Sequence, residues 1–438
     1  MSKTSDILVL GATGLTGRQA TKFLAAHPDR TSKKFTLAIA GRSKKKLDAL
    51  VSDLGLPQDI RVITLDVTNE HEVNEAVKLT RVVLNTVGPY YRWGTPVVRA
   101  CATHGVHYVD LTGESLWIAR IIRQFDYQAM KTRAIIVPAC GFDSIPSDIS
   151  VFIGNKALKD LDPSLNVASS TTVFTKVAGT LSLGTLDSMI GMRLLPTSER
   201  NDLQRDYLLS PVQDGPPSLG IRPIYRLQVP GTPKKTVTGT FWLMMPSNKP
   251  IVQRSWGLLE HEFLSKKSAG SEISRARYGP SVVYDEFLKT RGTLSAAILA
   301  TTLGIFWGLL GLAPFRWLAR RLVSRVDNAT DEQLDNGSFV TTNVTTSTTS
   351  ARYPRPIQVT TTLKGKGDAG YLLSPIWMAE CAMALLDTGS LPELARRGGI
   401  LTPATAFGDV LVKRLEANER MTVHYEVHKG TEESRKNI

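Results

Sequence analysis

Three glycines spaced three residues apart, Gly11, Gly14 and Gly17, form the pattern with the clearest chemical meaning. The whole stretch reads Gly11, Ala12, Thr13, Gly14, Leu15, Thr16 and Gly17. It follows an apolar run over 6–10 and precedes a helical pattern over 16–26. Glycine lets the backbone approach a pyrophosphate, and the start of the next helix supplies N–H donors. The stretch predicts a dinucleotide-binding loop, with a plain glycine-rich turn as the alternative.

The residues after the second apolar run, over 35–39, indicate which dinucleotide is bound. NAD-preferring sites place an acid there for the ribose 2′-hydroxyl, but here Arg42, Ser43 and Lys46 follow, and no acid occurs before Asp48. Arg42 can pair with a 2′-phosphate, Ser43 can donate, and a lysine adds charge. The alternative is a solvated first helical turn, although lysines there oppose the helix dipole. We therefore predict NADP(H).

Two further segments are expected to border this cofactor. Asp66 closes a third apolar run and is placed to accept from the adenine amino group, with a simple helix cap as the alternative. The residues that close the fourth run, over 81–85, should pass beside the ribose and pyrophosphate. They are Thr86, Val87, Gly88 and Pro89.

Proton transfer and carbonyl polarisation need side chains at the carboxyl ends of the strands, where open α/β sheets bind ligands. We select as catalytic candidates Tyr90, Tyr91, Asp143 and Ser144. Asp110, Thr112, Glu114 and Cys140 lie at equivalent strand ends. Asp110 and Asp143 could instead cap turns, and a cysteine such as Cys140 is more often a small buried hydrophobe.

We expect no metal site. Cys101, His104 and His107 lie near one another in the chain, but their spacing does not suit a closed site and no fourth ligand is near.

The elements that position these residues alternate between short apolar strands and helices over the first 140 residues. Further helices are expected over 43–54, 69–78, 94–104 and 115–131, and strands over 61–65, 106–109 and 134–137. Such alternation predicts right-handed βαβ units and a buried parallel sheet. Strand patterns at 169–177, 236–244 and 335–364 predict a largely antiparallel sheet in a second domain.

The fold class is therefore α/β, with an N-terminal Rossmann-type doubly wound parallel sheet and an α+β second domain. We divide the chain into a cofactor domain (1–140), a substrate domain (141–374), C-terminal helices (375–416) and a polar tail (417–438).

Several motifs resemble the saccharopine dehydrogenase-like oxidoreductases, most closely their trans-acting enoyl reductase branch. They are GATGLTG (11–17), AGRSKKKL (40–47), LNTVGPYYRWGTPVV (84–98), CATHGVHYVDLTGE (101–114) and VPACGFDSIPSD (137–148), with weaker echoes at 182–185, 367–371 and 398–409. The chain departs from the branch at Leu183 and Ala369, where a glycine and a proline are usual. The resemblance implies a nicotinamide-dependent reductase whose C-terminal helices pack back on the Rossmann domain.

Members of this branch reduce carbon–carbon double bonds in lipid or polyketide acyl intermediates, in trans to the synthase that carries them. The resemblance thus implies an acyl substrate, carrier-bound on a synthase, and leaves a homodimer open. The alternatives are a reductase of imine or amino-acid adducts of the saccharopine type, and a non-catalytic NADP(H)-binding protein at a membrane surface.

A 22-residue stretch over 294–315 contains no charged residue. As one helix it would be about 33 Å long, which matches the hydrocarbon core of a bilayer. Basic residues flank it on both sides. It could span a membrane, dip into one leaflet and return, or line an acyl-chain tunnel as a buried helix. The family that the sequence resembles includes eukaryotic members found on lipid droplets, and this resemblance favours the segment that dips into one leaflet and returns.

The composition and charge of the chain limit which other classes of protein it can belong to. Of the 438 residues, 42% are hydrophobic and 21% charged, as in globular proteins, and three cysteines exclude a disulfide scaffold. The net charge of +13 favours anionic partners, but no nucleic-acid-binding motif accompanies it. The first residues lack a signal-peptide pattern, so we expect a protein that is not secreted and acts on the cytoplasmic side, at a membrane or lipid droplet.

Overall fold

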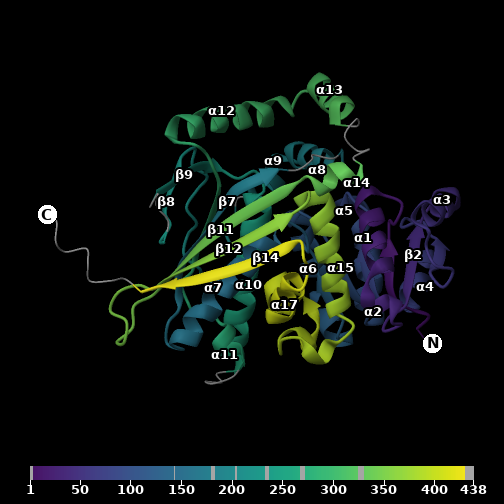
Figure 1. Ribbon diagram of the computed structural model, residues 1–438, viewed down its shortest axis with the longest axis horizontal. Coiled ribbons are helices and arrows are strands. Elements are labelled where there is room, and N and C mark those ends of the chain that lie inside the picture. Colours follow the sequence, from purple (N-terminus) through teal and green to yellow (C-terminus); the bar gives the residue numbers. More distant parts are fainter. Residues whose placement is uncertain are drawn as a thin grey trace.

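The computed structural model describes residues 3–142, 144–178, 183–202, 205–231, 236–266, 272–323 and 330–429. Two seven-stranded sheets, A and B, form its framework, and helices cover them (Figure 1). Sheet A contains β1 (Ser5–Leu10), β2 (Leu37–Gly41), β3 (Arg61–Thr64), β4 (Thr80–Asn85), β5 (His107–Asp110), β6 (Ile135–Val137) and β13 (Gly399–Ile400). Sheet B contains β7 (Val167–Ala178), β8 (Tyr225–Gln228), β9 (Thr236–Phe241), β10 (Val283–Lys289), β11 (Ser338–Ser347), β12 (Gln358–Lys366) and β14 (Met421–His428).

Sheet A is wholly parallel, with the order β13-β6-β5-β4-β1-β2-β3. Its central strands are apolar and buried, as a sheet with helices on both faces requires. The order reverses between β1 and β4, which is the point where doubly wound folds bind ligands. The predicted Rossmann-type sheet is therefore confirmed.

Helices connect these strands. They are α1 (Leu15–Ala26), α2 (Pro28–Thr31), α3 (Lys44–Leu54), α4 (Glu70–Lys78), α5 (Tyr90–His104), α6 (Ser115–Thr132), α7 (Ile145–Leu161), α8 (Leu183–Arg193), α9 (Thr197–Asp202), α10 (Met245–Lys266), α11 (Glu272–Ala276), α12 (Thr293–Leu309), α13 (Ala313–Val323), α14 (Asp331–Asp335), α15 (Ser374–Ala384), α16 (Pro403–Phe407) and α17 (Asp409–Glu416). A π-helical turn (Ala369–Leu373) and two short 3₁₀ turns (Thr388–Ser390 and Ala395–Arg397) complete the series.

Sheet B has the order β14-β12-β11-β7-β10-β9-β8, and all its pairs are antiparallel except β7 with β10. The predicted, largely antiparallel second sheet is thus also confirmed. Helices α7 and α10 pack on it, and α7 begins shortly after β6 ends, so the chain passes from sheet A to sheet B within a few residues.

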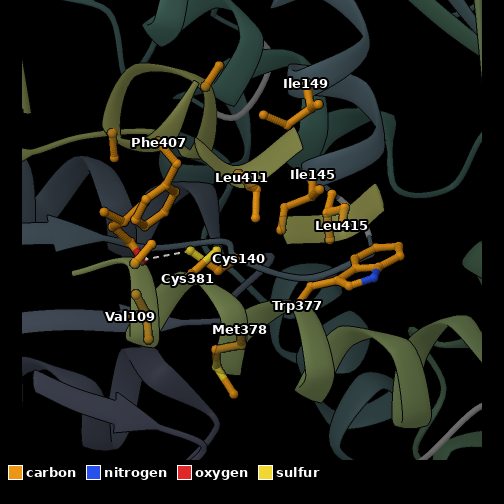
Figure 2. Packing of buried hydrophobic residues seen from close by; sticks show 14 of the residues in the cluster. Val109, Cys140, Ile145, Ile149, Trp377, Met378, Cys381, Phe407, Leu411 and Leu415 are labelled. Carbon is orange, nitrogen blue, oxygen red and sulfur yellow. Dashed lines mark hydrogen bonds between the residues drawn. The ribbon is translucent and has the colours of Figure 1, made fainter. Parts of the chain in front are cut away.

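The last part of the chain returns to sheet A. Strand β13 extends that sheet beside β6, and α15 packs against α1 (Figure 1). One hydrophobic core connects the two sheets, because Trp377 and Cys381 of α15 belong to the same cluster as Val9 of β1 and Phe339 of β11. Figure 2 shows Trp377 and Cys381 among Ile145, Phe407 and Leu415.

The polar tail predicted over 417–438 is wrong for its first part. Met421–His428 forms β14, which pairs with β12 over its whole length. Its side chains are mostly exposed, so the strand carries little hydrophobic signal and is held by backbone hydrogen bonds. Residues 430–438 lie outside the described part of the chain.

The apolar stretch over 294–315 forms parts of two helices rather than one continuous helix. Helix α12 ends at Leu309, and α13 begins at Ala313 after a bend of 110°. The pair lies at the periphery of the molecule, over the β9 end of sheet B and over α8 (Figure 1). Among the described residues no single helix is long and apolar enough to cross a membrane. The two helices of this bent pair reach the required length and apolar composition only when they are taken together.

Candidate functional site

The glycine loop sits between β1 and α1, at the reversal point of sheet A. Gly11 has a φ of +87°, and a Cβ there would lie 2.7 Å from Thr86 Oγ1, so only glycine fits. A Cβ on Gly17 would lie 2.8 Å from Ala12 Cα and even closer to the Gly11 carbonyl oxygen. Gly14 is different, because its Cβ would meet only the Gly11 carbonyl oxygen, at 3.5 Å.

Gly14 is also the N-cap of α1 and has no side chain with which to cap it. The first-turn N–H groups of Leu15 and Thr16 therefore point outward at the end of the helix, next to Ala12 and Thr13. Such a helix start, reached by a backbone free of side chains, fits the pyrophosphate of a dinucleotide.

The end of β2 places Arg42, Ser43 and Lys46 next to the loop. Arg42 is exposed, and Ser43 caps α3 by accepting the N–H of Lys46 at 3.4 Å. Lys44 pairs with Asp48, which leaves the Arg42 guanidinium as the cation directly after the strand. The arrangement fits a 2′-phosphate held by Arg42 and the start of α3.

Asp66 follows β3 and faces Arg42, whose charge contributes to lowering the pKa of the Asp66 carboxyl; the larger causes are hydrogen bonds from Thr68. The N–H and the hydroxyl of Thr68 both donate to Asp66 Oδ1, at 2.9 and 2.8 Å. Asp66 therefore caps a turn, and among the described residues its Oδ2 has no hydrogen-bond partner. The helix cap itself is Asn69.

The residues after β4 border the glycine loop as predicted from their order. The hydroxyl of Thr86 donates to the Leu10 carbonyl oxygen at 2.9 Å, and a Cβ on Gly11 would lie 2.8 Å from Val87 Cγ2. Gly88 and Pro89 then lead into α5, and Pro89 is its N-cap.

The first turn of α5 is capped by Glu114, one of the residues noted from the sequence at the end of the fifth strand. Glu114 Oε1 accepts the N–H of Tyr90 at 3.0 Å, and Oε2 accepts that of Tyr91 at 2.7 Å. Burial raises the pKa of this carboxyl. The contact explains why α5 begins at Tyr90 and not at Gly94, the predicted start. A glutamate directly after a strand and before a helix was the available signal.

The two tyrosines have different surroundings. Tyr90 is buried, its ring packs against Trp117, and its hydroxyl donates to the Asn85 carbonyl oxygen at 3.1 Å. Burial raises the pKa of Tyr90 well above its usual value, and its ring and hydroxyl both contact other residues of the chain. Tyr91 is 39% exposed and contacts Gly191 of α8. Of the two tyrosines, Tyr91 is therefore the one exposed at the surface.

The remaining catalytic candidates lie after β6. Asp143 is outside the described residues. Ser144, at the start of α7, is buried, and its hydroxyl has no hydrogen-bond partner among the described residues. Cys140 lies in the apolar core beside Cys381, and burial raises the pKa of its thiol (Figure 2). Cys140 therefore contributes to packing.

Cys101, His104 and His107, considered above as metal ligands, are buried or hydrogen-bonded to other residues of the chain. Cys101 is buried, His104 Nε2 lies 2.9 Å from Asn74 Oδ1, and His107 Nδ1 accepts the N–H of Ile135.

Asp110 connects the carboxyl ends of three strands. Its Oδ1 accepts the N–H groups of Thr112 and Ala139, each at 3.0 Å, and its Oδ2 accepts the hydroxyl of Tyr108 at 2.7 Å. That hydroxyl in turn accepts from Asn85 of β4. Burial raises the pKa of Asp110 to about 7. With both oxygens occupied, Asp110 positions the loops of the site.

A second acid, Glu286 of β10, lies on the sheet B side. Its Oε1 accepts from Asn248 Nδ2 at 2.8 Å, and its Oε2 accepts from Ser147 at 2.7 Å. Burial raises the pKa of Glu286 to about 7. Next to Asn248, Ser247 donates to the Gly113 carbonyl oxygen at 2.6 Å, which connects this network to the loop after β5. Two adjacent acids, Asp285 and Glu286, inside a strand were the sequence signal for it.

Apolar side chains from the second domain border the same loop. The Met244 Cε would lie 3.6 Å from a Cβ on Gly113, and the Trp242 ring stacks on Phe174 at 4.7 Å. Ser188 of α8 lies 3.5 Å from Glu114 Oε1. The end of β5 thus meets both the apolar loop after β9 and α8.

Comparisons with known proteins agree with this geometry. The family model described as the saccharopine dehydrogenase NADP binding domain matches residues 7–135. A trans-acting enoyl reductase of Mycobacterium tuberculosis is 33% identical over 434 residues, covering 94% of this chain and 95% of the relative. One from Mycobacterium ulcerans is 31% identical over 429 residues, with the same coverage. The chain belongs to the saccharopine dehydrogenase-like family.

The fold of this family is also found in a solved structure. Apo saccharopine dehydrogenase (L-Glu forming) from Saccharomyces cerevisiae has a TM-score of 0.51 over 97% of this chain and 100% of that chain, at 14% sequence identity. The pairing of a parallel N-terminal sheet with a second, mixed sheet is therefore common to both proteins.

The saccharopine dehydrogenase-like family assignment makes this protein an NADP-dependent oxidoreductase, and the predicted NADP(H) cofactor is confirmed. Bound NADPH supplies a hydride. The residues of this chain fit it: the glycine loop and the start of α1 would hold the pyrophosphate, and Arg42 would hold the 2′-phosphate. Of the two departures from the enoyl reductase pattern, Ala369 is buried in a π-helical turn that packs on α1, and the Leu183 side chain lies outside the described part.

Proposed function

We propose that this oxidoreductase reduces the enoyl double bond of a lipid or polyketide-type acyl intermediate, in trans to the synthase that carries it. The observation that carries the proposal is the similarity to trans-acting enoyl reductases over 94% of the chain. It extends well beyond the cofactor domain, so it includes the elements that surround a substrate.

The surroundings of the candidate site support an acyl substrate. Beside the loop that carries Glu114, the second domain contributes Met244 and α8, and α8 carries the apolar Leu186, Met189 and Ile190. An acyl chain is stabilised by contact with such side chains, whereas the two carboxylates of a saccharopine-type substrate require paired cations.

The roles of the chain's own residues follow from their positions. Glu114 and Asp110 fix the loops after β4 and β5, so that the reacting atoms are held in place. Tyr91 has the accessible hydroxyl at this point and can donate a proton to the substrate carbon or hydrogen-bond its carbonyl. Ser144, with its unpartnered buried hydroxyl, is the second donor to consider.

The test is NADPH oxidation by the purified chain with enoyl and saturated acyl thioesters, followed by mass spectrometry of the product. We expect oxidation only with the enoyl thioester, and a product heavier by two hydrogens. Oxidation of NADPH with an imine or amino-acid adduct alone would support the saccharopine-type alternative. Tight NADPH binding without turnover of either class would support the non-catalytic alternative.

A further inference from the structure

The bent pair α12–α13 exposes a large apolar surface that nothing else in the described chain covers. Leu294, Ile298 and Ile305 on the outer side of α12 are 77, 60 and 58% exposed. On α13, Trp317 is 62% exposed, and none of the residues of this helix is buried. The buried tunnel helix expected as one alternative from the sequence is therefore not what the structure contains. Contiguous apolar surface of this kind marks an interaction site.

We propose that α12–α13 is a docking element for a lipid layer with anionic headgroups, and that it lies in the plane of the layer. The argument begins with charge. Residues 293–323 contain three arginines, Arg316, Arg320 and Arg321, and no acidic residue. Amphipathic interfacial helices combine such arginines with tryptophan and leucine, and anionic headgroups attract them.

The bend gives the pair the shape that this role needs. The guanidinium of Arg316 donates to the carbonyl oxygens of Leu310 and Gly311, at 3.1 and 2.7 Å, and so closes the end of α12. Arg193 of α8 donates to the Trp307 carbonyl oxygen at 3.1 Å, and Arg320 pairs with Asp187 of α8 at 2.8 Å. The pair is thus fixed to α8 at the periphery of the molecule (Figure 1), and Leu294, Ile298 and Ile305 of α12 remain exposed.

A second copy of the chain is the main rival occupant. Gly304 and Gly308 on the exposed side of α12 would permit close helix contact. In a two-fold dimer, however, the same surface of both copies meets, and the arginine-rich helix α13 of one copy would face that of the other. The charge distribution therefore favours lipid.

The position of the pair connects docking to the candidate site. Leu310, Phe306 and Phe315 pack on Leu186, Met189 and Ile190 of α8, and Leu243 joins the same cluster. The opposite contacts of α8 reach Glu114 through Ser188 and Tyr91 through Gly191. A substrate whose acyl chain partitions into lipid would therefore meet the protein one helix away from the site. This delivery step rests on the proposed function, whereas docking does not.

The test measures co-sedimentation of the full chain, with NADPH bound, with phosphatidylcholine vesicles that contain or lack phosphatidylglycerol. The variant is I298E/I305E, because both side chains are exposed and their replacement leaves the α8 contacts intact. Leu310 is unsuitable for this purpose because it is fully buried. The matched control is Y127E/L264E, which changes two side chains that are 80 and 60% exposed on α6 and α10.

We expect the wild type and the control to bind phosphatidylglycerol vesicles, more weakly at high salt. I298E/I305E should bind at least about tenfold more weakly while its NADPH affinity stays unchanged, which shows that it is folded. A wild type that ignores both vesicle types would overturn the proposal. So would a dimer that dissociates only in I298E/I305E, because the surface would then belong to a second copy.

A parallel assay separates this inference from the proposed function. A short, soluble enoyl thioester should be reduced equally by the wild type and by I298E/I305E, and a long-chain enoyl substrate in vesicles only by the wild type. If vesicle binding holds and neither substrate is reduced, the proposed function fails and docking stands. If both proteins reduce the vesicle-bound substrate equally, the delivery step fails.

Discussion

The Glu114 carboxylate shows how one buried side chain prepares the candidate site. It accepts the N–H groups of Tyr90 and Tyr91 at the start of α5, where a helix otherwise leaves donors without partners. The contact fixes the loop after β4 against the loop after β5. Tyr91 is consequently held at the surface of this junction, whereas Tyr90 points into the core.

Cofactor preference is tested at Arg42. Replacing Arg42 with Asp should weaken NADPH binding by more than about tenfold, or about 1.4 kcal/mol, because a charge-assisted contact to the 2′-phosphate is lost. NADH binding should change little, since NADH lacks that phosphate. Fluorescence titration with both cofactors measures the two affinities. The control is Arg355→Asp, an exposed arginine in the second domain. Equal affinities of the wild type for NADPH and NADH would contradict the assignment.

The role of Tyr91 is tested by Tyr91→Phe. The ring and its contact with α8 remain, but the hydroxyl is removed, so kcat for an enoyl thioester should fall by about 10²-fold if it donates a proton. NADPH affinity should stay unchanged, and so should the rate of Tyr127→Phe, which changes an exposed tyrosine on α6. Full activity of Tyr91→Phe would contradict a proton-donating role for Tyr91 and leave Ser144 as the remaining candidate donor.

At the scale of elements, different glycines of the loop are expected to serve folding and cofactor binding. A methyl group on Gly14 meets only the Gly11 carbonyl oxygen at 3.5 Å, whereas one on Gly17 overlaps the Gly11 and Ala12 backbone. Gly14→Ala should therefore keep the melting temperature and weaken NADPH binding by at least about tenfold, because the pyrophosphate must approach there. Gly17→Ala should lower stability by about 2 kcal/mol or more. Calorimetry with and without NADPH distinguishes them. A Gly14→Ala protein that binds NADPH normally would mean that the loop has another role.

The first six strands of sheet A and the helices between them were predictable because each one carries a local pattern. Strands β1 and β2, for example, are apolar and buried, and the helices that follow them show amphipathic periodicity, so the local pattern identifies both. Strand β13 was not predictable, because its two residues lie within the range predicted as C-terminal helices and are defined by their pairing with β6. The cofactor residues follow from the same order, because strand ends in a doubly wound sheet meet at one edge.

Elements that depend on distant contacts were not predictable in this way. Strand β14 has exposed side chains and is defined by its pairing with β12. The break after Leu309 needs Arg316 to reach back to the α12 carbonyl groups, and no periodicity shows that contact. Glu286 becomes part of a site network only because α7 and α10 bring Ser147 and Asn248 to it.

At the scale of the whole molecule, buried acids connect parts that are distant in the chain. Asp148 of α7 accepts from Ser255 of α10 at 2.5 Å and from the N–H of Ala404 at 2.8 Å. Asp110 joins three strand ends in sheet A, and Glu286 joins sheet B to α7 and α10. Burial raises the pKa of each of these carboxyls to about 7. The junctions between the sheets and their helices therefore hold protons that an unfolded chain would release.

This proton retention predicts a pH dependence of global stability. Between about pH 4 and about pH 7 the folded protein binds more protons than the unfolded chain at these three carboxyls, so their contribution to the free energy of unfolding falls as pH rises. The contribution is complete below the ordinary carboxyl pKa and is lost as pH passes the raised value. Each group can contribute up to about 1.4 kcal/mol per pH unit within this window.

Glu286→Gln isolates one of these groups. The glutamine oxygen can accept from Asn248, and its amide can donate to the Ser147 and Tyr284 oxygens, so these contacts can be kept while the titrating proton is removed. Urea unfolding between about pH 5 and about pH 7 should show wild-type stability falling by about 1–2 kcal/mol more than that of Glu286→Gln. The exposed Glu416→Gln should keep the wild-type slope. If Glu286→Gln and the wild type show parallel slopes, Glu286 is already ionised at low pH in the folded protein and does not hold a proton at this junction.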